Sequence, residues 1–204
     1  MSALTNLFVG GTVVTYPERE ERPMRKIVAG LFISLDGVVE SPEKWHFPYF
    51  NEEMGESVGR LMRRGDTMLL GRGTYEEFAA HWPHQDSSVD PVAKLLNETP
   101  KYVVSTTLDA ATWHNSTIIS HDVAARVTEL KQRPGRDITM SGSPTLVRWL
   151  LTEGLLDELH LLVHPIVLGT GRRLFEEGMG RIPLTLTASE SFGSGVLDLT
   201  YERA

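Results

Sequence analysis

Apolar residues follow two alternating patterns along most of the chain. Short runs rich in Val, Ile, Leu and Phe are typical of buried strands, and longer segments with apolar residues at helical spacing are typical of amphipathic helices. The patterns predict strands at residues 25–37, 66–71, 101–105, 116–120, 137–142 and 157–169, and helices at residues 51–65, 74–82, 91–99, 121–133 and 143–154. This alternation predicts a three-layer α/β domain, with a largely parallel central sheet and helices on both faces.

The two ends of the chain depart from this alternation. Residues 183–192 and 196–203 alternate apolar and polar positions on either side of a Gly-Ser-Gly turn, which predicts an antiparallel hairpin at one edge of the sheet. Residues 1–23 form a mildly apolar and then charged stretch. We interpret this stretch as an N-terminal extension to a single domain at residues 24–204.

Local signals indicate where two of the helices begin and end. Ser143 suits an N-cap, Pro144 suits the first helical position, and Gly154 suits the turn that ends the helix. Thr74 and Glu77 have the spacing of a capping box, in which each side chain caps a backbone N–H group at a helix start. These features need no ligand to explain them.

The composition excludes several kinds of chemistry. The net charge of −7 and the pI near 5.5 argue against nucleic-acid or anionic-membrane binding, which needs a broad basic face. No apolar run reaches the roughly 18 residues of a membrane span. The absence of cysteine excludes disulfides, thiolate catalysis and Cys-ligated zinc. We expect a cytoplasmic protein without a metal site that acts on a small molecule.

Candidate functional residues follow the predicted strands. In α/β sheets, ligands bind beyond the carboxyl ends of the strands, and these ends carry Asp36, Gly71, Arg72, Ser105 and residues 141–143. Two of the ends lead directly into predicted helices, whose N-termini offer free N–H groups that suit phosphate. An arginine there adds a charge-assisted contact. Together these residues predict a trough for a dinucleotide.

The same segments resemble a known family. The stretch LLGRGTYEEF (69–78) resembles the GRxTxE segment of the dihydrofolate reductase-like superfamily, and KYVVSTTL (101–108) resembles its next cofactor strand. Residues 33–37 (ISLDG) and 141–175 are similar to the reductase domain of the bifunctional riboflavin-biosynthesis deaminase-reductase and its stand-alone relatives. The matching segments run from about residue 25 to residue 203. The resemblance implies a dihydrofolate reductase-like fold.

The resemblance also implies an NADPH-dependent oxidoreductase. Its closest functional type is the reductase of 5-amino-6-(5-phosphoribosylamino)uracil in riboflavin biosynthesis, and related proteins lead us to expect a homodimer. Residues at the family's cofactor positions would hold the phosphates and riboses of NADPH. These positions are Gly71, Arg72, Thr74, Ser105, Thr106, Gly142, Ser143, Thr145 and Leu146.

Three residues are candidates for the substrate side. Asp36, at the end of the first domain strand, would anchor the substrate or supply a proton, although it also fits the first position of a tight Asp-Gly turn. Trp45 would wall the pocket of a flat heterocycle or plug the edge of the core. Arg173 would meet an anionic group or remain a solvated loop charge. Reduction by hydride transfer needs no protein nucleophile.

Departures from the family pattern leave the substrate open. Val38 and Val39 stand where riboflavin reductases typically carry a basic residue, which argues against a ribose-phosphate substrate. Ser143 stands where family members often carry a second glycine. Three glutamates within residues 52–56 lie in the region where dihydrofolate reductases bind the pteridine. Dihydrofolate reductase activity is therefore one alternative, and a non-catalytic NADP(H)-binding module is another.

Overall fold

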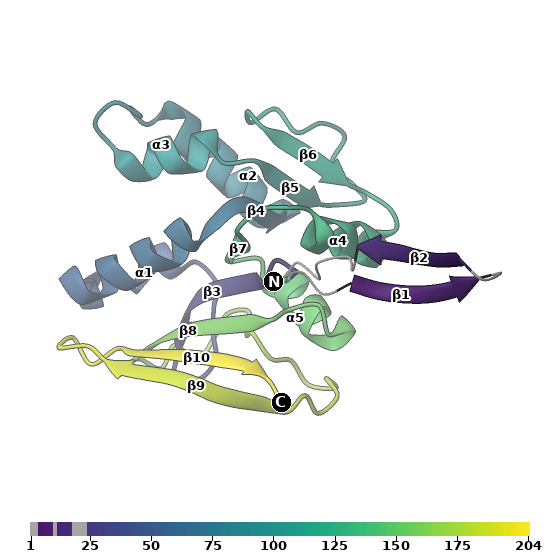
Figure 1. Cartoon of the computed structure of the whole chain (residues 1–204). Coiled ribbons are helices and arrows are strands. Elements are labelled where there is room, and N and C mark those ends of the chain that lie inside the picture. Colours follow the sequence, from purple (N-terminus) through teal and green to yellow (C-terminus); the bar gives the residue numbers. More distant parts are fainter. Residues whose placement is uncertain (1–3, 10–11, 18–23) are drawn as a thin grey trace.

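The computed structural model of the protein describes residues 4–9, 12–17 and 24–204 (Figure 1). The larger sheet contains β3 (Ile27–Ser34), β4 (Gly65–Gly71), β5 (Lys101–Val104), β6 (Ser116–Ile119), β7 (Asp137–Ser141), β8 (Glu158–His164), β9 (Leu184–Ser191) and β10 (Leu197–Arg203). The α-helices are α1 (Glu52–Arg64), α2 (Arg72–His81), α3 (Pro91–Glu98), α4 (Val123–Gln132) and α5 (Pro144–Glu153). A separate two-stranded sheet pairs β1 (Leu4–Val9) with β2 (Thr12–Pro17). The predicted domain boundary at residue 24 stays a prediction.

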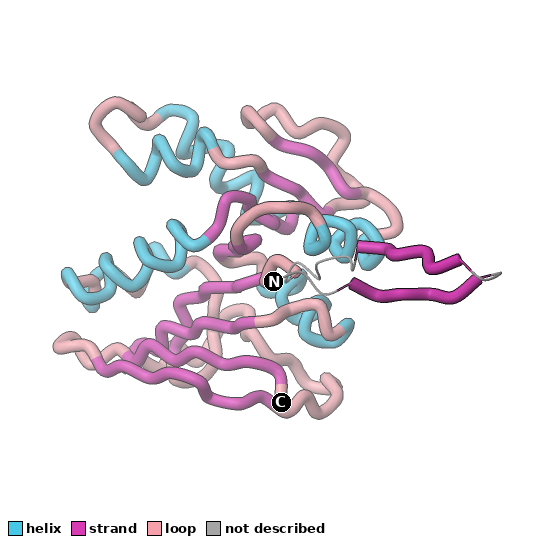
Figure 2. Tube along the Cα trace, viewed as in Figure 1, coloured by secondary structure: helices cyan, strands magenta, loops and turns pink. Residues whose placement is uncertain are grey.

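The larger sheet has the strand order β6-β5-β4-β7-β3-β8-β10-β9. Strands β3 to β8 pair with one another in parallel, and β10 runs antiparallel to both β8 and β9. Because β10 runs in the opposite direction, its first residues lie beside the carboxyl end of β8. The prediction of a mostly parallel sheet with a C-terminal hairpin is confirmed (Figure 2).

Helices cover both faces of this sheet. Successive side chains of a strand point to opposite faces, and the odd-numbered residues of β3 pack in a core with residues of α4 and α5. On the other face, Phe32 packs in a cluster with Met54 of α1. Leu70 of β4 shares a third cluster with Tyr75 of α2 and Leu96 of α3. The predicted three-layer arrangement is therefore confirmed.

The observed elements differ from the sequence predictions in a few places. Helix α2 begins at Arg72, two residues before the predicted start, and β8 ends at His164 because Pro165 follows it. Residues 41–50, for which no helix or strand is predicted, contain two short 3₁₀ helices, Pro42–Lys44 and Phe47–Tyr49. Within the described part of the chain, no helix is long and apolar enough to cross a membrane.

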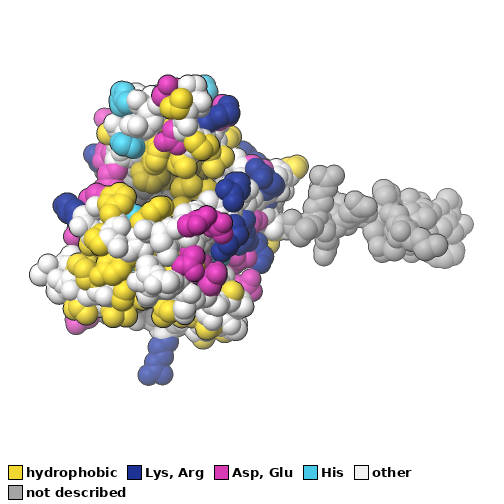
Figure 3. Space-filling view, turned by 90° about the vertical axis from the view of Figure 1, so that its left-hand side faces the viewer, with side chains coloured by type: hydrophobic (Ala, Val, Ile, Leu, Met, Phe, Trp, Pro, Cys, Tyr) yellow, Lys and Arg dark blue, Asp and Glu magenta, His cyan; other side chains and the backbone are white. Residues whose placement is uncertain are grey.

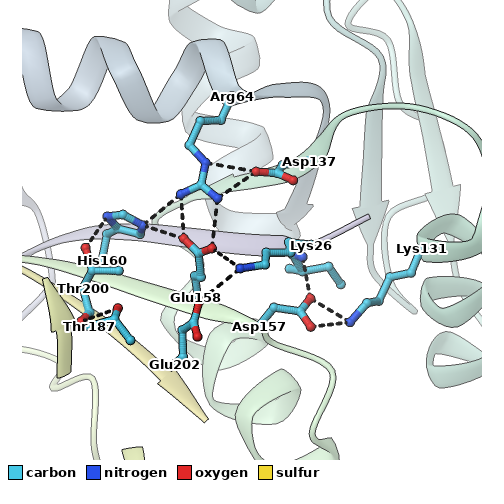
Figure 4. Close-up of polar contacts among 11 residues, drawn as sticks. Lys26, Arg64, Lys131, Asp137, Asp157, Glu158, His160, Thr187, Thr200 and Glu202 are labelled. Atoms are coloured by element: carbon cyan, nitrogen blue, oxygen red, sulfur yellow. Dashed lines mark hydrogen bonds and ion pairs between the residues drawn. The ribbon is translucent and has the colours of Figure 1, made fainter. Parts of the chain in front are cut away.

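An ion-pair network fastens the end of α1 to the sheet (Figure 4). The Glu158 carboxylate accepts hydrogen bonds from Arg64 Nη1 at 2.6 Å and from Lys26 Nζ at 2.8 Å, and it lies 3.2 Å from His160 Nε2. Arg64 also pairs with Asp137 at 2.9 Å. The Glu158 side chain is only 7% exposed, and its hydrogen bonds with His160 and Arg64 hold its pKa well below the ordinary value.

We predict that Glu158→Gln lowers the free energy of unfolding by about 2 kcal/mol at neutral pH, because it leaves the Arg64 guanidinium without its main partner. A folded-state pKa below the unfolded value of about 4.3 gives stability that is present above that pH and lost as the pH falls. The deficit of the variant should therefore shrink between about pH 5 and pH 3. Urea unfolding across this range measures it.

Glu202→Gln is the matched control, because Glu202 meets the same Lys26 at 3.0 Å but is 41% exposed. Its effect should stay within about 0.5 kcal/mol. A Glu158→Gln deficit that stays constant down to pH 3 would contradict the proposed electrostatic origin.

Candidate active site

A cavity of about 990 Å³ opens at the edge of the sheet where the parallel strands end. Its walls come mainly from α1, α2, α3 and α5, from the strands between them, and from the loop at residues 39–46. Figure 3 views the molecule from this side and shows hydrophobic side chains gathered in a hollow. The sequence-predicted residues that line the cavity are Gly71, Arg72, Thr74, Gly142, Ser143, Thr145 and Leu146.

The turns after β4 and β7 are held against each other by three hydrogen bonds. The Ser143 Oγ atom accepts from the Gly71 N–H group at 2.8 Å and donates to Thr74 Oγ1 at 3.0 Å. The Ser143 N–H group donates to the same Thr74 oxygen at 2.9 Å. Because Thr74 Oγ1 accepts twice here, its own hydroxyl hydrogen remains to donate elsewhere.

This contact between the turns after β4 and β7, called the crossing below, explains why each turn carries a glycine. A Cβ on Gly71 would lie 3.3 Å from Ser143 Oγ, and a Cβ on Gly142 would lie 3.0 Å from Thr74 Oγ1. Gly142 also has a φ of +65°, in the left-handed region where side chains are strained. Ser143 shares this region with a φ of 57°, so the two turns approach closely at some cost in backbone strain.

Two helices begin at the crossing, and neither is capped by a side chain. The N-cap residues of α2 and α5 are Gly71 and Ser143, and neither makes a side-chain cap hydrogen bond. The capping-box interpretation of Thr74 and Glu77 is wrong, because Thr74 lies inside the first turn of α2 and bonds to Ser143 instead. Two helix starts with uncapped N–H groups therefore meet at one cavity, which is the arrangement that favours anions.

Arg72 connects α2 with the loop after β5. Its Nε atom donates to Glu76 at 2.7 Å and its Nη1 atom donates to Thr107 Oγ1 at 2.7 Å. Ser105 is buried, and its hydroxyl accepts the N–H groups of Thr107 and Leu108. Neither Ser105 nor the exposed Thr106 lines the cavity. The sequence analysis missed Thr107, the residue of this loop that touches Arg72.

Asp36 holds a neighbouring loop and does not line the cavity. Its carboxylate accepts hydrogen bonds from Ser34 Oγ at 2.7 Å and from the N–H groups of Leu168 and Gly169 at 3.1 and 2.9 Å. These contacts, with Ser34 foremost, keep the pKa of Asp36 far below its ordinary value. A carboxyl group that stays ionised cannot act as a proton donor near neutral pH, so this geometry favours the turn interpretation of Asp36.

The other two substrate candidates also lie away from the cavity lining. Trp45 is buried, and its indole N–H group donates to the Glu40 carbonyl at 2.9 Å. The half-exposed Arg173 donates from Nε to the Asp36 carbonyl at 2.8 Å. Trp45 therefore plugs the core edge, and Arg173 fastens the same turn as Asp36.

Several lining residues were missed by the sequence analysis. His46 stacks on Phe32 with ring centroids 4.5 Å apart and an interplanar angle of 11°, and burial lowers the pKa of His46. Ser57 of α1 and Asp198 of β10 line the cavity beyond this stack. Phe32 could have been found from the sequence, because its even-numbered position places it on the face of β3 opposite the odd-numbered core residues. No local sequence pattern identifies Asp198, because it reaches the site through the pairing of β10 with β8.

The described residues contain no group of three His, Asp or Glu side chains placed to hold a metal ion. The cavity lining instead offers uncapped helix ends, two arginines (Arg72 and Arg172), hydroxyl groups and the buried carboxylate of Asp198.

Comparison with known proteins gives a consistent result. Residues 25–197 match the family model described as the RibD C-terminal domain. Two curated proteins of Bacillus subtilis (strain 168) are similar over most of their length. The uncharacterized protein YyaP is 30% identical over 87% of this chain and 94% of its own. The uncharacterized protein YwjB is 31% identical over 88% of this chain and 99% of its own.

Solved structures share the fold. The structure of a putative riboflavin biosynthesis protein from Shewanella sp. PV-4 has a TM-score of 0.69 and 21% identity, covering 88% of this chain and 99% of that one. Yeast riboflavin biosynthesis reductase Rib7 has a TM-score of 0.57 and 15% identity, covering 92% and 93% of the chains. Dihydrofolate reductase from Enterococcus faecalis, complexed with NADP(H), also has a TM-score of 0.57 and 15% identity, covering 87% and 96%.

The crossing of the two turns generates a prediction about stability. Thr74→Val keeps the shape of the side chain but removes the acceptor of both Ser143 hydrogen bonds. We expect the free energy of unfolding to fall by about 1–2 kcal/mol, because the Ser143 N–H group loses its partner. Thr74→Ser retains the hydroxyl group and should lose less than about 1 kcal/mol. Urea unfolding compares the two, and equal stabilities would show that these bonds do not hold the crossing.

Proposed function

The chain belongs to the RibD C-terminal domain family, and from this premise we propose that it is an NADPH-dependent reductase of a small heterocyclic compound. The closest functional type is the riboflavin-pathway pyrimidine reductase. The observation that carries the proposal is the meeting of two uncapped helix starts at one cavity, with Arg72 beside them. Such an arrangement favours a ligand with several phosphate groups.

The residues at the crossing fit a dinucleotide. The first-turn N–H groups of α2 and α5 and the free Thr74 hydroxyl hydrogen would hold the pyrophosphate. The lack of a Cβ at Gly71 and Gly142 lets the backbone come close to it. Arg72, held toward the loop after β5 by Thr107, would bind the further phosphate that distinguishes NADPH from NADH. When bound, NADPH supplies the hydride.

The remaining work of the protein is to position the substrate. The cavity continues from the crossing to Phe32, His46, Ser57 and Asp198. Apolar walls exclude water from the reacting atoms, and polar groups set into such walls orient a ring. Because Asp36 is held as a carboxylate in a loop, we propose that the proton that accompanies the hydride comes from solvent or from the substrate itself.

The two alternatives from the sequence are less well supported. Glu52, Glu53 and Glu56 are exposed and do not line the cavity, so α1 offers no carboxylate to a pteridine. Ser57 is the polar residue of α1 that lines the cavity. A non-catalytic nucleotide-binding module would have a closed or wholly apolar substrate side, whereas this cavity reaches a buried carboxylate at Asp198. The expected homodimer and the cytoplasmic location stay predictions.

We predict that the protein binds NADPH more tightly than NADH and that Arg72→Ala removes this preference. The loss of a charge-assisted contact should weaken NADPH binding about tenfold or more. Fluorescence titration of the purified protein with both nucleotides measures it. Arg133→Ala is the matched control, because Arg133 also pairs with a glutamate one helical turn away, at 2.8 Å, but lies outside the cavity lining. Equal binding of NADPH by wild type and Arg72→Ala would contradict the phosphate role.

The reductase activity is tested separately by NADPH consumption. We expect turnover with 5-amino-6-ribosylaminouracil or its phosphate and none with dihydrofolate. Turnover of dihydrofolate alone would favour the first alternative. Tight NADPH binding without turnover of either compound would favour the non-catalytic module.

A further inference from the structure

A polar pair stands in the wall of the cavity opposite the cofactor turns. Phe32 of β3, Leu162 of β8 and Asp198 of β10 are register partners in three neighbouring strands. All three line the cavity, so they form one row across the face that α1 covers. The Ser57 hydroxyl group of α1 donates to Asp198 Oδ2. We propose that Asp198, positioned by Ser57, is the residue that selects the substrate ring, and that it selects a ring with two adjacent N–H donors.

Asp198 has hydrogen-bonding capacity that its described neighbours do not fill. The residue is only 9% exposed, and Ser57 is its one side-chain partner among the described residues. A carboxylate has room for about four hydrogen bonds, and a buried one that lacks partners is costly. Glu158, the other buried carboxylate among the described residues, is by contrast supplied by Arg64, Lys26 and His160. The open positions of Asp198 are therefore available to a ligand.

The surroundings of Asp198 leave room for a planar ring. Phe32, Leu61 and Leu162 form apolar walls, and the His46 ring is stacked on Phe32. A second cavity of about 670 Å³, between α1 and strands β9 and β10, is also lined by Ser57 and Asp198. The pair therefore lies between two open spaces. A planar ring can reach the carboxylate while its substituents continue outward.

Asp198 lies several strands away from the crossing of the two turns. The strand order β7-β3-β8-β10 places Asp198 three strand spacings from the strand that carries Ser141, or roughly 14 Å at the usual spacing. A one- or two-ring compound anchored at Asp198 fills this interval and presents an edge to the nicotinamide position. This step rests on the proposed function, because it takes the crossing to be the cofactor site.

The chemistry of the pair defines the donors that it takes. The two oxygens of a carboxylate accept two parallel N–H groups, which is the strongest neutral-ligand contact it can make. The Ser57 hydroxyl group donates its hydrogen to Asp198, so toward a ligand its oxygen can act only as an acceptor. The site therefore favours adjacent N–H groups, such as the N1–H and 6-amino groups of a 6-aminopyrimidine, and disfavours a ring that presents carbonyl oxygens there.

A pair of uracil compounds tests the inference. Calorimetric titration of wild type with 6-aminouracil and with 6-amino-1-methyluracil, each with and without NADPH, compares a ring that has both donors with one that has lost N1–H. We expect the first compound to bind at least about tenfold more tightly. Asp198→Asn should remove this difference, because its amide offers a donor where the ring needs an acceptor.

Glu190→Gln is the matched control, since Glu190 is an exposed carboxylate in the wall of the second cavity and does not line the first. It should retain the preference for 6-aminouracil. Ser57→Ala should weaken 6-aminouracil binding by about threefold, because the Asp198 carboxylate loses the hydroxyl group that positions it. If Asp198→Asn does not fold, this variant still tests the role of the pair. The inference is overturned if wild type does not prefer 6-aminouracil, or if Asp198→Asn keeps the preference.

The NADPH titration keeps this result separate from the cofactor proposal. A preference for 6-aminouracil that depends on Asp198, in a protein that binds no NADPH, supports the ring anchor and removes the reductase proposal. NADPH binding by wild type and by Asp198→Asn, without any ring preference in wild type, leaves the cofactor proposal standing and removes the anchor.

Discussion

The site depends on one contact, the hydrogen bonding of Ser143 to the turn that follows β4. Strands β4 and β7 are neighbours in the sheet, so the turns at their carboxyl ends must share one small space. Ser143 Oγ accepts the N–H group of Gly71, the last residue of β4, and the Ser143 N–H group donates to Thr74. The polar groups of both turns are thereby satisfied across the gap rather than within each helix. The first turns of α2 and α5 are left uncapped at the cavity as a direct consequence.

This arrangement strains the backbone at Ser143 and brings together two uncapped helix starts, which favour anions. Ser143 occupies the left-handed region, where a residue with a side chain is disfavoured by about 1 kcal/mol relative to glycine. Glycine would relieve the strain but would lose the hydroxyl group that bridges to Gly71 and Thr74. Two hydroxyl hydrogen bonds are worth about as much as the strain. Ser143 therefore has little net effect on the free energy of unfolding. Its hydroxyl bridge instead fixes the distance between the starts of α2 and α5.

Much of the fold and part of the site could be predicted from local patterns. Apolar periodicity and Gly-Pro punctuation located the strands and helices, and the strand-to-helix turns pointed to Gly71, Arg72 and Gly142. Local patterns did not decide the role of a side chain that had more than one plausible partner. Thr74 fitted a capping box by spacing, yet its oxygen faces Ser143, a residue 69 positions away. Asp36 fitted a catalytic acid by position, yet it meets N–H groups beyond residue 165. Contacts between distant segments decide both cases, and no local pattern contains them.

The substrate wall shows why the antiparallel hairpin belongs to the site. In the parallel part of the sheet, only residues near strand ends reach the ligand edge. Because β10 runs the other way, Asp198 reaches that edge from near the start of its strand, beside Leu162. The turns proposed to hold the cofactor follow β4 and β7, whereas the carboxylate lies on a strand that adds to the far side of β8. On the proposed assignment, changes in the hairpin would alter ring recognition without disturbing the crossing of the two turns, because the two parts of the cavity are carried by different strands.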